Sequence, residues 1–256
     1  MIIQLSPRVR ADIVYGTSLA FRPWWGLRDN CLFCDPSKTD EERRQRPYPI
    51  VGSSDWAGGG SEELRFDTQS LRLEGLLLDI PESNKQSSWV EPYLRAADWP
   101  TGILARPVPS WFILPPQPSR WYMEQADILY CMDLHGSTGE EVTLLRIADA
   151  LALVCTGSTY RGWVLFDAAS HLTRAGSPES PAAVRALLHA YITLVAEPYI
   201  EPMWDGDPHL KAALLDLRER ILAAGAGGGS HEQLEVLRLA TEDVLSYIYR
   251  WAVPDP

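Results

Sequence analysis

The sequence is poor in cysteine and has no long apolar run. Its 256 residues include only four cysteines, which are Cys31, Cys34, Cys131 and Cys155. No stretch approaches the ~18 consecutive apolar residues of a membrane-spanning helix, and residues 1–14 lack the apolar core of roughly 7–15 residues that marks a secretory signal. We therefore expect a cytoplasmic protein that does not associate with a membrane and whose cysteines are reduced thiols.

Basic side chains are also scarce relative to acidic ones. The chain carries 23 lysines and arginines against 34 aspartates and glutamates, so its formal net charge at pH 7 is −11. Nucleic-acid binding requires lysines and arginines that neutralise phosphates, so this balance disfavours a nucleic-acid partner. The same charge favours solubility and also speeds the encounter with a basic protein. The composition thus points to a protein partner, and a basic one fits best.

No complete catalytic motif is present. The glycine-rich stretch 225–230 has no following Lys-Ser/Thr pair, so it does not form a phosphate-binding loop. No serine has the G-x-S-x-G context of a nucleophile elbow, and no histidine pair has the H-E-x-x-H spacing. The missing motifs make an enzyme the less favoured class of protein, although catalytic residues scattered along the chain remain an alternative.

The clearest structural pattern spans the middle of the chain. Residues 128–134 and 162–167 are short apolar runs, and residues 141–155 between them have apolar side chains at helical spacing. Ser137 and Glu140 stand in the S-x-x-E relation of a capping box, which marks a helix start. We therefore predict a strand, a helix and a second strand, which together form a central βαβ unit.

Two further regions have recognisable patterns. Residues 63–81 alternate apolar and polar side chains around a turn-like segment, which predicts a pair of antiparallel strands. After residue 180, Ser-Pro, Asp-Pro and Ser-x-x-Gln starts precede three apolar stripes of helical period. We predict a single α+β domain over residues 1–256, with a mixed β-sheet and a helical C-terminal part. Its expected parts are a strand- and loop-rich region 1–125, a βαβ core 126–175 and a helical region 180–252.

One candidate catalytic site lies at the end of the first predicted strand. Asp133, His135 and Glu140 fall between that strand and the predicted helix, where α/β sheets commonly bind ligands. His135 has the residue type of a general base near neutral pH. A loop histidine beside a helix-capping carboxylate explains the same residues without chemistry, and we favour that interpretation.

The cysteines suggest a metal site as an alternative. Cys31 and Cys34 form a C-x-x-C pair, and Cys131 with His135 forms a C-x3-H pair, which together supply the ligand types of a Cys3His zinc site. The two pairs are far apart in the chain, and buried cysteine often behaves as a small apolar residue. We therefore expect neither a metal nor another cofactor.

Tryptophan is abundant, and three of the ten tryptophans are candidate anchors for a partner. Trp24, Trp25 and Trp56 stand in segments rich in proline and glycine, where loops can present side chains outward. Tryptophan is enriched at the energetic centres of protein interfaces. The alternative is that these side chains hold loops onto the core.

Three segments resemble bacterial immunity proteins that neutralise polymorphic toxins. They are LRIADALALVCTG (145–157), GWVLFD (162–167) and FDTQSLRLEGLLLDIP (66–81). The resemblance implies a cytosolic protein that binds a cognate toxin domain and blocks its site. The net charge of −11 favours a basic toxin domain. These families share no common motif, so no binding residue is carried over. The alternative is a hydrolase or transferase with a pocket at Asp133, His135 and Glu140.

Overall fold

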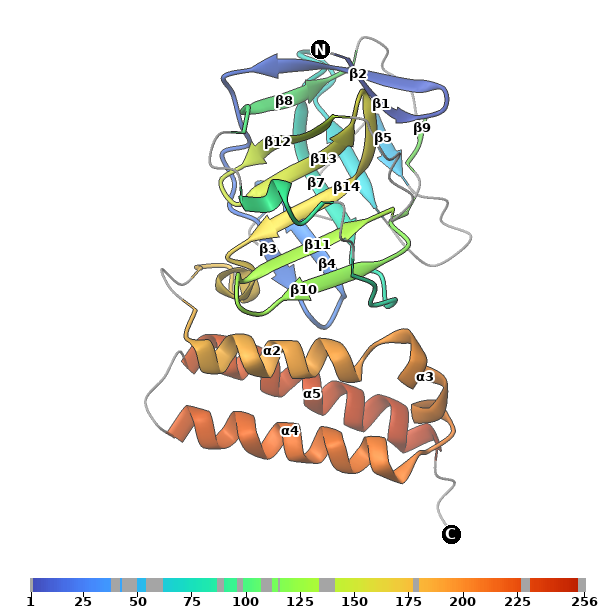
Figure 1. Ribbon diagram of the computed structural model, residues 1–256, viewed down its shortest axis with the longest axis vertical. Coiled ribbons are helices and arrows are strands. Elements are labelled where there is room, and N and C mark those ends of the chain that lie inside the picture. The colour runs from blue at the N-terminus through green and yellow to red at the C-terminus, as the bar shows by residue number, and fades with distance from the viewer. Residues whose placement is uncertain are drawn as a thin grey trace.

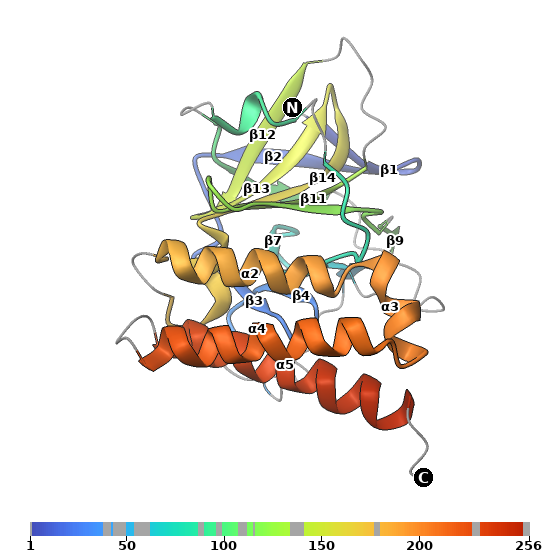
Figure 2. The same cartoon turned by 60° about the horizontal axis from the view of Figure 1, so that its bottom comes forward.

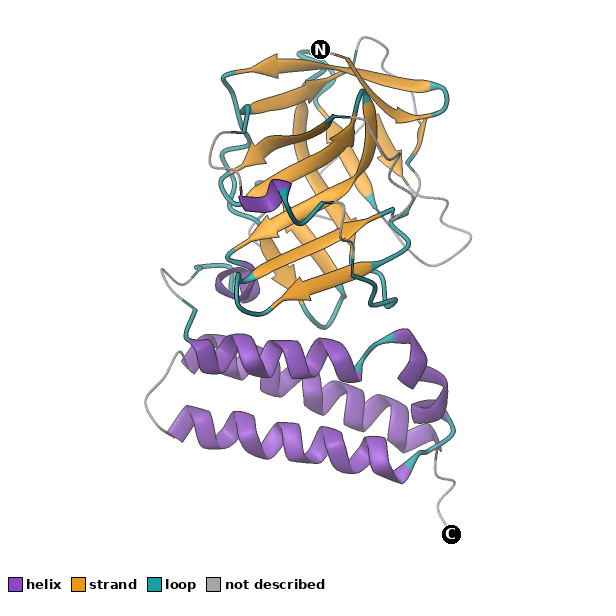
Figure 3. Cartoon of the chain, in the orientation of Figure 1, coloured by secondary structure: helices purple, strands orange, loops and turns teal. Residues whose placement is uncertain are grey.

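The computed structural model describes residues 2–37, 42, 50–53, 62–86, 90–95, 99–106, 112–114, 116–133, 141–176, 180–226 and 231–252. Within these residues the chain forms two β-sheets and the helices α2 to α5, with the short 3-10 helices η2 (Tyr93–Arg95) and η3 (Ala168–Leu172). The helices lie together at one end of the two sheets (Figures 1 and 3).

The larger sheet is organised around β14. Its strands are β1 (Ile2–Ser6), β2 (Val9–Tyr15), β8 (Gly102–Ala105), β10 (Arg120–Met123), β11 (Ile128–Met132), β12 (Val142–Ala148), β13 (Leu151–Thr156) and β14 (Thr159–Phe166). β14 is antiparallel to both β11 and β13, and it is parallel to β1 at the register Gln4 with Thr159. A single bridge between Thr101 and Arg146 brings the β8 side of the sheet back to β12, so the sheet curls strongly.

The smaller sheet contains the predicted strand pair. Its strands are β3 (Trp24–Gly26), β4 (Cys31–Cys34), β5 (Ile50–Ser53), β6 (Glu63–Phe66), β7 (Leu73–Asp79) and β9 (Phe112–Ile113), in the order β3-β4-β7-β6-β5-β9. β6 and β7 are antiparallel, as the alternation at 63–81 predicts. Asp67 stabilises the turn because its Oδ1 accepts hydrogen bonds from the backbone N and the hydroxyl of Ser70, each at 2.7 Å.

One apolar core joins the sheets to the helices. Leu76 of the smaller sheet, Trp163 of the larger sheet and Leu188, Leu217 and Leu237 of three different helices all belong to the same cluster of buried side chains. A second cluster covers the opposite face of the larger sheet, where Tyr130 and Val154 lie against Val90 and Leu94. The larger sheet is therefore buried on both faces over much of its area.

The helical region contains the three predicted helices and one more, α3, that the sequence pattern did not predict. It comprises α2 (Ala182–Leu194), α3 (Glu197–Trp204), α4 (Pro208–Ala226) and α5 (His231–Ala252). Asp207 caps α4 as predicted, since its Oδ1 accepts hydrogen bonds from the backbone N atoms of His209 and Leu210 at 2.7 and 3.2 Å. In Figure 1 α2 lies between the strands and α4, whereas Figure 2 shows β3 and β4 below α2, toward α4 and α5.

The fold class is α+β with mixed sheets, as predicted, but the central βαβ unit is wrong. Residues 142–156 form the antiparallel strands β12 and β13, and the predicted capping residues Ser137 and Glu140 lie outside the described residues. All six residues of β13 are buried, so its apolar side chains show no alternation that would separate a strand from a helix. A turn at Gly157-Ser158, with Gly157 at φ 55°, joins β13 directly to β14.

Arg120 fixes the position of the helices relative to the sheets. Its side chain extends from β10 and is almost fully buried. The Nη2 atom donates to the carbonyl oxygens of Ile192 and Val195 at 3.2 and 3.1 Å, where α2 ends. Nε donates to Asn84 Oδ1 at 2.9 Å, and Nη1 donates to Asn30 Oδ1 at 3.2 Å. A cation at a helix C-terminus is favourable, so this contact holds α2 against the strands.

Candidate partner-binding groove

A groove of about 1140 Å³ separates the β3–β4 hairpin from α5. The chain segment that follows η3 forms one end of it. The lining side chains are mostly apolar, with a few charged groups at the rim. The residues that this section uses are Trp24, Trp25, Arg28, Arg174, Val236, Leu239, Asp243 and Tyr247.

The two predicted anchors Trp24 and Trp25 both line this groove, but they differ in exposure. Trp25 is 0% exposed and belongs to the main core, so the expectation that its side chain is presented outward is wrong, and its role as an anchor stays a prediction. Adjacent residues of a strand point to opposite faces, and β3 turns Trp25 inward. Trp24 is partly exposed. Its ring stacks on Phe33 at 4.9 Å between centroids, and the Arg174 guanidinium lies 4.0 Å from its centroid. Trp56 lies outside the described residues.

The helix side of the groove comes from residues that the sequence analysis missed. Val236, Leu239, Asp243 and Tyr247 line the groove at spacings of three and four, so they share one face of α5. It adjoins the buried stripe of the helix, because Val244 and the core residue Ile248 also line the groove. Tyr247 is 65% exposed and Leu239 is 37% exposed, which makes this face apolar yet open to solvent. The sequence did contain a signal for this face, because Leu239 and Tyr247 are large apolar residues outside the buried stripe of α5.

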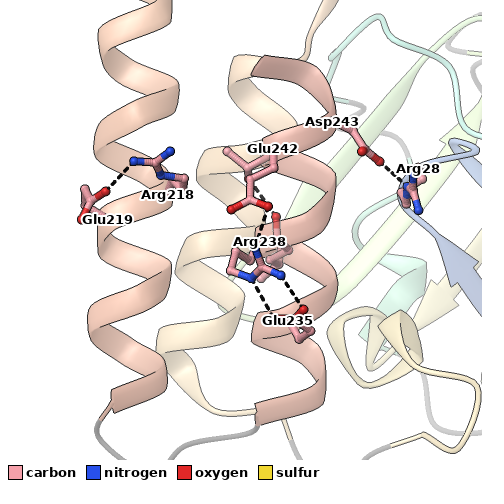
Figure 4. Close-up of polar contacts among 9 residues, drawn as sticks. Arg28, Arg218, Glu219, Glu235, Arg238, Glu242 and Asp243 are labelled. Carbon is pink, nitrogen blue, oxygen red and sulfur yellow. Dashed lines mark hydrogen bonds and ion pairs between the residues drawn. The ribbon is translucent and has the colours of Figure 1, made fainter. Parts of the chain in front are cut away.

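An ion pair joins the two sides of the groove. Arg28, in the turn after β3, pairs with Asp243 of α5, and Figure 4 shows the two side chains pointing toward each other across the gap. On the adjacent face of α5, Arg238 is held between Glu235 and Glu242, with both nitrogen–oxygen distances at 2.6 Å. The acidic side chains next to the groove are thus largely paired with arginines.

The predicted catalytic residues lie elsewhere. Asp133 follows β11 and lines a cavity of about 430 Å³, where its Oδ2 is 3.4 Å from Arg161 Nη1. His135 and Glu140 lie outside the described residues, so their position relative to Asp133 stays a prediction. The described part of this alternative site is one carboxylate with an arginine partner.

The C-x-x-C pair does not bring its two thiols together. Cys31 and Cys34 are three residues apart in β4 and therefore point to opposite faces of the strand. Cys34 lies in the main core with Cys131, whereas Cys31 lies in a small cluster with Phe33. Burial raises the pKa of Cys34 to about 12 and raises that of Cys131 as well, which disfavours the thiolates that zinc requires. Among the described residues no group of three or more His, Cys, Asp and Glu side chains is arranged to hold a metal.

No family model, curated protein or solved structure matches the chain. In the described part of the chain, no helix combines the length and the apolar character that crossing a membrane requires.

Proposed function

We propose that this chain is a binding protein that holds a segment of another protein in the groove between β3 and α5. The observation that carries the proposal is the exposed apolar face of α5, where Leu239 and Tyr247 stand beside Trp24 in a groove of about 1140 Å³. Clustered exposed apolar side chains with a polar rim are typical of protein interaction sites. A tyrosine and a tryptophan are residue types that commonly supply most of the binding energy.

The charge of the chain supports a basic partner. A net charge of −11 speeds the approach of a basic protein, while the apolar groove supplies the lasting contact. Together with the resemblance of residues 66–81, 145–157 and 162–167 to immunity proteins, these features favour an inhibitor that binds a toxin domain in the cytoplasm. The alternative enzyme hypothesis at Asp133 lacks comparable support in the described residues, because that carboxylate is paired with Arg161.

The proposal is tested by affinity capture from the native host followed by a toxicity assay. Wild-type protein, Leu239→Asp and Leu215→Asp serve as baits. Leu215 is a matched control, because it lies on α4 and is also 37% exposed. We expect one basic protein to be retained by the wild type and by Leu215→Asp, but not by Leu239→Asp.

The captured protein is then produced in a second host with and without this chain. We expect it to arrest growth alone and to be harmless when the wild-type chain is present. Retention by Leu239→Asp would move the binding surface away from the groove. A partner that never impairs growth would contradict the inhibitory function.

A further inference from the structure

A second cavity, of about 460 Å³, lies beside η3 where three strand ends converge. The β10–β11 turn, the β12–β13 turn and the end of β14 form its walls, together with the first turn of α2. In contrast to the groove, most of its side chains are ionisable. Those that the argument uses are Arg22, Asp127, Asp149, Asp167, His171 and Arg185.

Asp127 is the buried carboxylate of this cavity. It is only 6% exposed, and its Oδ1 accepts hydrogen bonds from the Tyr122 hydroxyl at 2.8 Å and from the backbone N of Ala169 at 2.9 Å. Burial raises the pKa of Asp127, and Asp167 raises it further, whereas Arg185 lowers it. Asp127, Asp167 and Arg185 all line the same cavity.

The backbone of both acidic residues is unusual. Asp127 and Asp167 adopt the left-handed conformation, with φ values of 52° and 49°. This conformation costs an ordinary residue on the order of 1 kcal/mol, although aspartate tolerates it better than most. The conformation sets the direction in which each carboxylate leaves the chain at the edge of the same cavity.

His171 contributes a hydrogen-bond acceptor. It is 2% exposed, and its Nδ1 lies 2.7 Å from the carbonyl oxygen of Pro23. A carbonyl oxygen only accepts, so Nδ1 carries the proton and Nε2 keeps a lone pair. Burial lowers the pKa of His171 to about 4, so the ring is neutral at physiological pH.

Arg185 contributes a donor with unused capacity. Its Nη1 donates to the carbonyl oxygen of Ser180 at 2.9 Å. Its Nε is buried and has no acceptor among the described residues. The guanidinium of Arg185 lines the cavity, so a ligand carboxylate can pair with it there. Arg22 is a second guanidinium at the rim, where its Nη2 donates to Ser170 Oγ at 3.1 Å.

We propose that this cavity binds a small zwitterion with an ammonium and a carboxylate group, the chemical class of the free α-amino acids. The carboxylates of Asp149 and Asp167 face the ammonium group, and Arg185 pairs with the carboxylate. His171 Nε2 accepts a further hydrogen bond from the ligand. A simple anion would face three aspartates, and a simple cation would face the guanidinium groups of Arg22 and Arg185. The volume suits a ligand of this size.

The test begins with thermal unfolding of the whole protein in ~10 mM of each standard free amino acid, because a ligand that binds only the folded state raises Tm. We expect at least one amino acid to raise Tm. Its N-acetyl form and its carboxamide form should each bind at least about tenfold more weakly, since each lacks one charge. No shift with any amino acid, or undiminished binding of either derivative, would overturn the proposal.

Variants then place the ligand. Arg185→Gln and Asp167→Asn should each raise Kd about tenfold or more, measured by calorimetry, whereas the exposed Arg220→Gln on α4 should leave it unchanged. Asn retains the tolerance for the left-handed conformation at position 167. Asp149→Asn in the exposed β12–β13 turn provides a second variant if either of the first two fails to fold. Wild-type affinity in the folded variants would rule out this cavity as the site.

Discussion

The groove and the cavity lie on either side of η3, yet they are built from opposite chemistry. Leu172 at the end of η3 faces the groove, where apolar side chains of α5 are exposed. Ser170 and His171, immediately before it, face the cavity, where charged groups surround a buried carboxylate. An exposed apolar face suits a large partner that excludes water, whereas a smaller hollow lined by charged side chains suits a small charged ligand.

Both sites depend on η3, a helix of only five residues that contributes side chains to each of them. A 3-10 helix has little stability of its own, so contacts from outside must hold it. Asp127 holds the backbone N of Ala169 from the cavity side, and Gln233 of α5 holds the carbonyl oxygen of the same residue at 2.8 Å. Substitution of Asp127 or Gln233 should therefore disturb both binding surfaces.

The largest effect is expected for Asp127→Ala. The change leaves the Tyr122 hydroxyl and the Ala169 N–H buried without their acceptor, which should lower the free energy of unfolding by about 4 kcal/mol. Urea unfolding measures the loss. Asp127→Asn keeps an acceptor oxygen and the tolerance for positive φ, so it should lose much less. Equal losses for the two variants would mean that these hydrogen bonds do not hold η3.

Acid should lower the free energy of unfolding, because protonation of the buried His171 is unfavourable in the folded protein. Its pKa is about 4 when folded, because burial disfavours the charged ring, against 6.5 for the free side chain. Its stabilising contribution is therefore complete above pH 6.5 and is lost as the pH falls through 4. The loss amounts to at most roughly 3 kcal/mol. Unfolding at a series of pH values should show a decline in the wild type that His171→Gln reduces. Parallel pH profiles for the two proteins would contradict this role.

A smaller loss is expected for Gln233→Met. Gln233 is buried and donates from Nε2 to Ala169 O at 2.8 Å and to Ser180 Oγ at 3.0 Å. Met fills a similar volume without the donor, so the free energy of unfolding should fall by about 1–2 kcal/mol. Gln125→Met, at an exposed turn position, is the control and should be nearly neutral. The same loss at both positions would show that the hydrogen bonds of Gln233 contribute nothing.

The smallest effect on stability is expected for Tyr247→Ala. The side chain is 65% exposed and makes an edge contact with Trp204 at 5.7 Å, so truncation should change the free energy of unfolding by less than about 0.5 kcal/mol. Binding of the captured partner should nevertheless weaken by ~2 kcal/mol, with faster dissociation. Tyr199→Ala on α3 is the control, since Tyr199 is exposed but lies outside the groove lining. Unchanged dissociation would exclude Tyr247 as an anchor.

The helices were predictable from the sequence because two local signals agree there. Asp207-Pro208 marks the start of α4, and Leu214, Leu217 and Ile221 mark its buried face. The β12–β13 hairpin was mispredicted because all six residues of β13 are buried, which removes the alternation typical of a strand. The Gly157-Ser158 dipeptide between two apolar runs was a hairpin signal.

The candidate sites depend on information that local patterns do not contain. Trp24 and Trp25 are indistinguishable in sequence, and only the orientation of β3 buries one and exposes part of the other. Asp127, Asp149 and Asp167 each follow or precede an apolar run, but their meeting depends on the order of the strands in the larger sheet. Sequence spacing alone could not place them in one cavity.

The position of β14 also has a consequence for the order of folding during synthesis. β1 gains its parallel neighbour only when residue 159 is available, so the first strand of the chain waits for more than half of the polypeptide. Pairing between such distant segments is slow because a long loop must close first. The ribosome therefore exposes the N-terminal hairpin of β1 and β2 well before its sheet is complete. During this interval the edge of β1 is unpaired and can pair with another chain. Rapid synthesis of β14, or a bound chaperone, would prevent this.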